Sequence, residues 1–160
     1  MAAVDYFLKL EGIPGESNDS KHKDEIEVTS FSWGETNSTA LLVGGAAGKV
    51  QMQDLSFAKR VDKASPKLLL ACATGQHLKS AVLTARKAGE SPQEFLVLTF
   101  SDVVVTSYQT GGVSGGADGA LDQVSLAFAR LQMEYRPERP DGSLDAPITA
   151  AWDIKQSRKV

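Results

Sequence analysis

The chain of 160 residues has one cysteine, two histidines and no apolar run longer than a strand. The lone Cys72 excludes an intramolecular disulfide, and its place on the apolar side of a predicted helix indicates a buried, inert thiol. The longest apolar runs, such as residues 95–100, are too short to cross a membrane as a helix. A net charge of −3 argues against a general nucleic-acid binder, which would carry a basic face. His22 and His77 have no cysteine or carboxylate at metal-ligand spacing, so we expect surface or turn roles for them and neither a metal nor another cofactor.

Patterns for catalysis are scarce as well. The sequence GVSGG at residues 112–116 formally matches G-x-S-x-G, with Ser114 as the nucleophile. That pattern requires a helix after the serine, whereas the next predicted element here is a strand. The carboxylates of Asp54, Asp62 and Asp102 are scattered, and Asp62 is expected to bond turn amides or to face the N-terminus of the helix that follows. We therefore predict no enzyme, and a serine hydrolase built on Ser114 remains an alternative.

One short helix is well marked in the sequence. Ser65 is a predicted N-cap, Pro66 suits the first helical position, and Gly75 supplies the left-handed residue that commonly ends a helix. Residues 67–74 between them are mostly leucine and alanine, which favour a helix of about 66–74. A helix of this length is marginal alone, so it must pack against a sheet.

The rest of the chain alternates between apolar and polar residues with the period of a β-strand. A change of parity near Thr29 predicts a bend or bulge in the second strand, as the corner of a barrel requires. Residues 95–100 are apolar on both faces and predict a strand buried on both sides, whereas the five glycines of residues 109–122 predict a mobile loop. Strands are predicted within residues 4–10, 26–36, 49–61, 78–87, 95–107, 121–135 and 148–154. The fold is therefore mainly β, a two-sheet antiparallel β-barrel or sandwich with one short flanking α-helix, in a single domain of residues 1–160.

Two further features concern the surface. Residues 35–48 form a long connection whose middle, Leu41, Leu42 and Val43, is apolar and flanked by glycine. Apolar loop residues of this kind indicate a surface covered by a partner, and the alternative is a loop folded back onto its own core. Along the bent second strand, Ser30 and Ser32 fall on the face opposite Phe31 and Trp33 and are predicted to face solvent.

Four segments, in this order and spacing, resemble the haemolysin-coregulated protein (Hcp) family of bacterial type VI secretion systems. They are FLKLEGI at residues 7–13 with GES at 15–17, SFSWG at 30–34, the stretch 57–70 that contains VDKASPKL, and the pair Trp152-Asp153. The resemblance runs over nearly the whole chain.

The resemblance implies a β-barrel subunit, without enzyme activity, that forms homo-hexameric rings stacking into a hollow tube. The tube is propelled through a contractile sheath and can carry or chaperone effector proteins in its lumen. The implied partners are effectors, the spike protein, and sheath and baseplate components, with no nucleic acid and no membrane insertion. Residues 35–48 correspond to the family's ring-to-ring contact, and the family guides our expectation that Ser30 and Ser32 face the lumen. The implied location is the bacterial cytoplasm followed by secretion, and the N-terminus, which enters a strand directly, predicts export without a cleaved signal peptide.

A monomeric ligand-binding β-barrel is the remaining alternative. Such a barrel would keep its apolar surface inside, whereas a subunit of a ring must expose apolar surface on two different patches.

Overall fold

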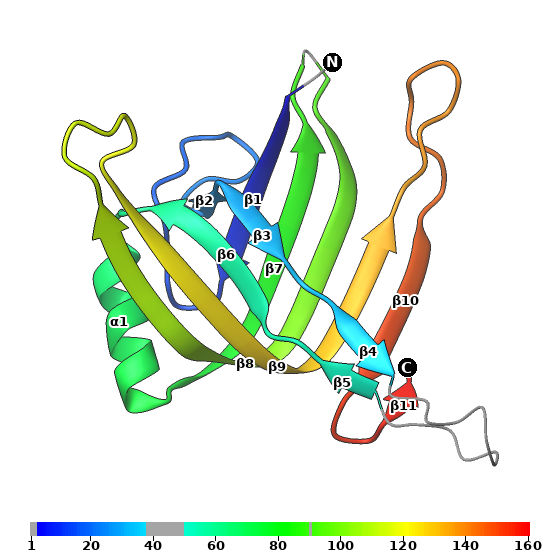
Figure 1. The fold of residues 1–160 in the computed structure, drawn as a ribbon. Helices are drawn as coiled ribbons and strands as arrows, with labels where there is room; N and C mark the ends of the chain where they lie inside the picture. Colours follow the sequence, from blue (N-terminus) through cyan, green and yellow to red (C-terminus); the bar gives the residue numbers. More distant parts are fainter. Residues whose placement is uncertain (1–2, 38–49, 90) are drawn as a thin grey trace.

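The structure, a computed structural model, describes residues 3–37, 50–89 and 91–160 (Figure 1). Leu41, Leu42 and Val43 lie outside these residues. The elements are β1 (Val4–Leu10), β2 (Ile26–Val28), β3 (Ser30–Ser32), β4 (Glu35–Asn37), β5 (Val50–Met52), β6 (Leu55–Arg60), α1 (Ser65–Thr74), β7 (His77–Lys87), β8 (Gln93–Gly112), β9 (Ala120–Tyr135), β10 (Ile148–Asp153) and β11 (Arg158–Lys159). The chain is mainly β with one short helix in the described part, as the sequence predicts.

Nine strands of the described residues form one antiparallel sheet that curls on itself, with β11, β10, β9, β8, β7, β1 and β2 as successive neighbours. Strands β4 and β5 form a separate two-stranded sheet. Strand β9 is long enough to pair twice, because residues 121–126 pair with β6 and residues 130–135 pair with β10. The chain bends at Thr29, so that β2 pairs with β1 while β3 pairs with β6. This bent segment bridges the two sides of the curl, which gives the barrel-like architecture that the change of parity predicted.

Helix α1 packs against β8, on the left of Figure 1. It buries Leu68 and Ala71 and ends at Gly75, whose φ of 68° is left-handed as predicted. The predicted N-cap is wrong: Ala64 occupies that position, and the hydroxyl of Ser65 donates a hydrogen bond to Asp122 on β9 instead. A partner distant in sequence has replaced the local cap.

The glycine-rich stretch is more ordered than expected. Strand β8 continues to Gly112 and β9 begins at Ala120, with Gly112 opposite Ala120, so only residues 113–119 form the turn. The prediction of a loop over residues 109–122 is therefore wrong at both ends. Cross-strand hydrogen bonds along a long hairpin outweigh the entropic cost of ordering the glycines.

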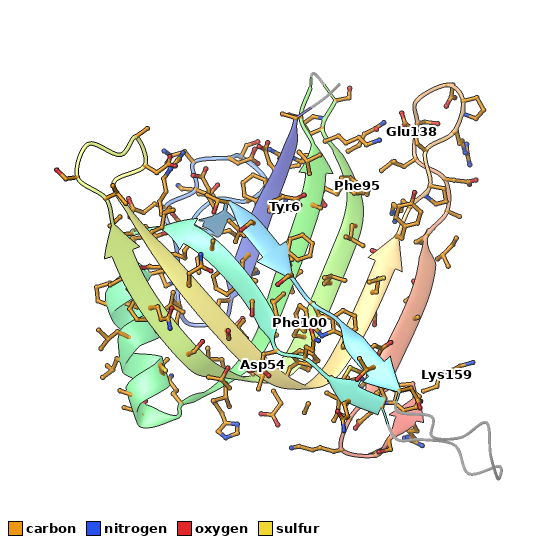
Figure 2. All side chains as sticks on the ribbon, in the orientation of Figure 1. Tyr6, Asp54, Phe95, Phe100, Glu138 and Lys159 are labelled. Carbon is orange, nitrogen blue, oxygen red and sulfur yellow. The ribbon has the colours of Figure 1, made fainter. Side chains whose placement is uncertain are left out.

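The core lies between the curled sheet and the helix, and Phe57, Phe100, Leu8 and Leu126 are among its buried side chains. In residues 95–100 only Leu98 and Phe100 are buried, while the opposite face, which includes Phe95, is half-buried. Figure 2 labels Phe100 and Phe95 on this strand. A single copy of the chain thus leaves one face of the strand partly open, against the prediction of burial on both sides.

No helix among the described residues has both the length and the apolar character needed to cross a lipid bilayer.

Candidate functional site

An apolar groove of about 820 Å³ lies between the β4–β5 hairpin and the β10–β11 end of the sheet. We call it the tryptophan groove, because Trp33 from the bend before β4 and Trp152 from β10 both line it. Met133 of β9 and Ala150 of β10 add apolar surface, and both are exposed. The groove is therefore an apolar surface that the described part of the chain does not cover.

Both indole groups at this groove lack hydrogen-bond partners. The Nε1 atoms of Trp33 and Trp152 are buried and meet no acceptor within the described residues. An indole N–H is only a donor, and leaving a buried donor unpaired costs about 1–3 kcal/mol. Both unpaired donors belong to residues that line the groove.

A second surface is a row of four serines that crosses four neighbouring strands. Ser32 of β3 lies opposite Ser56 of β6, Ser56 lies opposite Ser125 of β9, and Ser125 lies opposite Ser107 of β8. The hydroxyls of Ser56 and Ser125 are 3.2 Å apart and hydrogen-bonded. Because residues opposite each other share one face of a sheet, these four form a continuous strip of small polar side chains, here called the serine row.

The parity of the strands places the serine row on the face away from the core. The adjacent row across the same strands is Phe31, Phe57, Val124 and Tyr108, all of which belong to the core or pack against it. Ser30 and Ser32 are exposed, as the sequence predicts. Sequence reasoning missed Ser56, Ser107 and Ser125, because only the register shows that they extend the same strip.

A buried polar cluster fixes the start of α1 to this sheet. The Nζ of Lys59 lies 2.9 Å from Oδ2 of Asp122 and 3.0 Å from Oγ of Ser65, and Tyr108 donates its hydroxyl hydrogen to Oδ1 of Asp122. Asp62 accepts from the backbone N–H of Ala64, as predicted for a turn residue. Every partner comes from a different element or turn, so the cluster holds β6, β8, β9 and α1 in one arrangement.

The cluster also sets two ionisation states. Burial disfavours the charged form of Asp122, but hydrogen bonds from Ser65, Lys59 and Tyr108 outweigh it and hold the pKa of this carboxyl below its usual range. Burial, followed by the neighbouring Asp122, raises the pKa of the Tyr108 hydroxyl. The carboxylate is therefore charged and the phenol neutral at neutral pH.

The residues that the sequence offers as candidates for catalysis do not lie together in the structure. Ser114 lies in the exposed turn between β8 and β9, and no histidine is paired with it. Asp54, Asp62 and Asp102 have separate partners: Asp54 accepts from Thr106, Asp62 pairs with Lys59, and Asp102 contacts both His77 and Lys155. Within the described residues no group of three or more possible metal ligands occurs.

The two histidines differ from each other. His77 is exposed and its Nδ1 lies 3.0 Å from Asp102, in agreement with a surface role. His22 lies in a turn of the polar loop, one of the two roles expected, but its side chain is buried: its ring stacks on Phe7, and its two nitrogens contact Glu25 and Glu94. Cys72 is only partly buried, although it packs against the core as predicted.

Comparison with known proteins identifies the family to which the chain belongs. The family described as "Type VI secretion system effector, Hcp" matches residues 7–135. Protein hcp1 of Pseudomonas aeruginosa strain PAO1 is 45% identical over 159 residues, covering 97% of this chain and 98% of that protein. The chain is thus a tube or effector protein of type VI secretion.

Solved structures agree with this class. Hcp1 from Salmonella typhimurium is 37% identical, with a TM-score of 0.81 and full coverage of both chains. A structure described as a type six secretion system protein gives a TM-score of 0.93 at 32% identity, over 99% of this chain and 100% of that one. The chain belongs to the Hcp family, whose members are secreted, structural proteins of the type VI system.

Proposed function

We propose that this chain is a non-enzymatic ring subunit, that six copies form a ring, and that the rings stack into a hollow tube carrying effector proteins in the lumen. The observation that carries the proposal is the tryptophan groove, where apolar surface lies open in a single copy beside two tryptophans whose buried Nε1 donors are unpaired within the described residues. A neighbouring subunit that fills the groove would bury the apolar surface. A monomeric ligand-binding barrel has no need of such a surface on its outside.

The face of β8 that includes Phe95 supports the same proposal. It is half-buried in a single copy although its sequence is apolar on both sides. A ring places one patch of each subunit against a different patch of the next, which requires two open regions on one chain. The groove and this face are two such regions.

The serine row, which begins at Ser32, supplies the proposed lumen wall, and Ser30 adds to it from the same face of β3. Small polar side chains allow a folded cargo to approach the wall without an apolar surface that would trap it. Leu41, Leu42 and Val43 are the proposed ring-to-ring contact. Effectors, the spike protein, and sheath and baseplate components are the proposed partners, met on the way from the bacterial cytoplasm to the outside without a cleaved signal peptide.

The mass of the purified protein tests the ring. Light scattering after size-exclusion chromatography should give roughly six times the subunit mass of 17.1 kDa. The substitution Ala150→Glu places a charge in the tryptophan groove at an exposed position and should yield folded monomers. Ala73→Glu on the exposed side of α1 is the matched control and should leave the ring intact. A monomer at all micromolar concentrations of the native chain would refute the ring.

A further inference from the structure

An acidic cleft of about 660 Å³ lies at the other side of the molecule, between β1, β2 and the turn after β6. Five carboxylates line it, those of Asp5, Glu16, Asp19, Glu27 and Asp62, together with two guanidinium groups. The net charge of the lining is therefore −3, equal to that of the whole chain. The rest of the chain therefore carries no net formal charge, and the negative charge is concentrated in this cleft.

The two arginines in the cleft are already paired. Arg86 binds Asp19 through both terminal nitrogens, at 2.9 and 2.7 Å, and Arg60 lies 3.3 Å from Asp118, which is outside the cleft. Asp5 also lies 3.8 Å from Arg86 and Asp62 pairs with Lys59, whereas Glu16 and Glu27 are exposed and make no ion pair within the described ranges. The cleft consequently keeps negative potential that internal contacts do not neutralise.

Arg86 adds an independent indication of a ligand. Its side chain is more than nine-tenths buried and lines the cleft, yet its Nε has no hydrogen-bond partner among the described residues. A charged N–H donor without an acceptor is costly to bury. The cleft therefore calls for an occupant that combines positive charge with an acceptor oxygen, as a basic peptide segment does through its side chains and its carbonyl groups.

The chain itself carries such a segment. Residues 155–160 contain Lys155, Arg158 and Lys159 and no acidic residue, and all six residues are exposed. Lys155 pairs with Asp102, whereas Arg158 and Lys159 form no ion pair within the part of the chain that the structure describes. Lys159 and Val160 also line the tryptophan groove, but Arg158 does not. We call residues 155–160 the basic segment.

The cleft and the basic segment lie too far apart to meet within one chain. Strands β2 and β11 stand at the two ends of the strand order, and Figure 2 shows Tyr6 of the cleft well separated from Lys159. A contact between them must join two copies, and because the two surfaces differ, it places copies head to tail. Complementary charge of this kind fixes orientation and accelerates association more than it adds affinity.

We propose that the basic segment of one copy docks in the acidic cleft of a second copy. Arg158 and Lys159 meet the carboxylates of the cleft, and a backbone carbonyl of the segment accepts from Nε of Arg86. The contact rests on the proposed tube, in which it joins successive rings and fixes the direction in which they stack. Because a ring repeats it once per subunit, weak individual pairs add up to a strong and salt-sensitive contact.

Ring-to-ring association of the full chain tests the proposal by sedimentation and negative-stain microscopy at about 0.05 M and about 0.5 M salt, where screening differs strongly. The double substitution Arg158→Glu with Lys159→Glu should raise the dissociation constant between rings about tenfold or more at low salt. Adding Glu27→Lys to the double variant exchanges the charges between the segment and the cleft, and it should restore a substantial part of the association between rings. Arg130→Glu and Glu11→Lys, both exposed and outside the two surfaces, are matched controls that should leave association unchanged.

The possible results separate this contact from the ring itself. Intact rings that stop stacking in the double variant, and stack again after the charge swap, support the contact. Native rings that do not associate at low salt, or stacking that the double variant leaves unchanged, overturn it while the ring stands. Variants that become monomers show that the segment acts within the ring, which also overturns the docking between rings.

Discussion

Lys59 and Asp122 form a completely buried ion pair, with 2.9 Å between Nζ and Oδ2 and no exposed surface on either side chain. The two residues come from β6 and β9, which pair directly. Ser65 connects the pair to the first turn of α1, because its hydroxyl contacts both charged groups. The only helix among the described residues is therefore fixed to the sheet by charge as well as by Leu68 and Ala71.

Removing one member of this pair should destabilise the fold strongly. Lys59→Met leaves Asp122 charged and unpaired in the core, and the expected loss is about 3–5 kcal/mol in the free energy of unfolding. Urea denaturation followed by circular dichroism measures it. Asp118→Asn breaks the exposed pair with Arg60 and should cost less than about 1 kcal/mol, so equal losses in the two variants would contradict the structural role assigned to the buried pair.

Stability should fall in acid partly through Asp122. The pKa of this carboxyl is lower in the folded chain than in the unfolded chain, so its contribution is complete above the ordinary aspartate value of about 3.9 and is lost as the pH falls through the folded value. Other carboxyls, such as Asp19 with its lowered pKa, contribute in the same direction. The difference in unfolding free energy between the native chain and Asp122→Asn should therefore shrink below about pH 4, and a difference independent of pH would show that Asp122 does not titrate in this way.

The serine row should control the retention of cargo. Ser32→Gln and Ser32→Glu put bulk or charge on the proposed lumen wall, and the amount of effector recovered with the rings should fall about tenfold, or about 1.4 kcal/mol. Folding should change by less than about 0.5 kcal/mol because the side chain is exposed. Ser20→Glu, exposed in the loop before β2, is the control. Equal recovery of effector from the native, Ser32 and Ser20 rings would remove the serine row from the lumen.

Leu41, Leu42 and Val43 should contribute to stacking rather than to folding. Serine at all three positions removes apolar contacts worth about 1.5–3 kcal/mol for each side chain that stacking would bury. Intact rings with at least about tenfold fewer stacked tubes are expected by light scattering and microscopy. Serine at Leu69 and Leu70, which are exposed on α1, is the matched control. If rings and tubes disappear together in the triple variant, the segment supports the ring or the fold instead.

The tertiary structure changed several expectations through long-range contacts. Ser65 is a good N-cap by sequence, but its hydroxyl donates a hydrogen bond to Asp122, which lies 57 positions further along the chain. His22 lies in a polar stretch, yet Phe7 and Glu94 draw it into a buried position. Composition and spacing carry no information on such partners, because the partners meet only after the strands have paired.

The sequence by itself determined the β-rich class, the position of the helix and the bend at Thr29, because these depend on proline, glycine and the parity of neighbouring residues. Only the tertiary structure decided the surfaces on which the proposals rest. The serine row needs the register of four strands, and the tryptophan groove needs Trp33 and Trp152 to meet from positions 119 residues apart. Local signals fix the direction in which a side chain points, whereas the residues beside it depend on which distant strand pairs with its own.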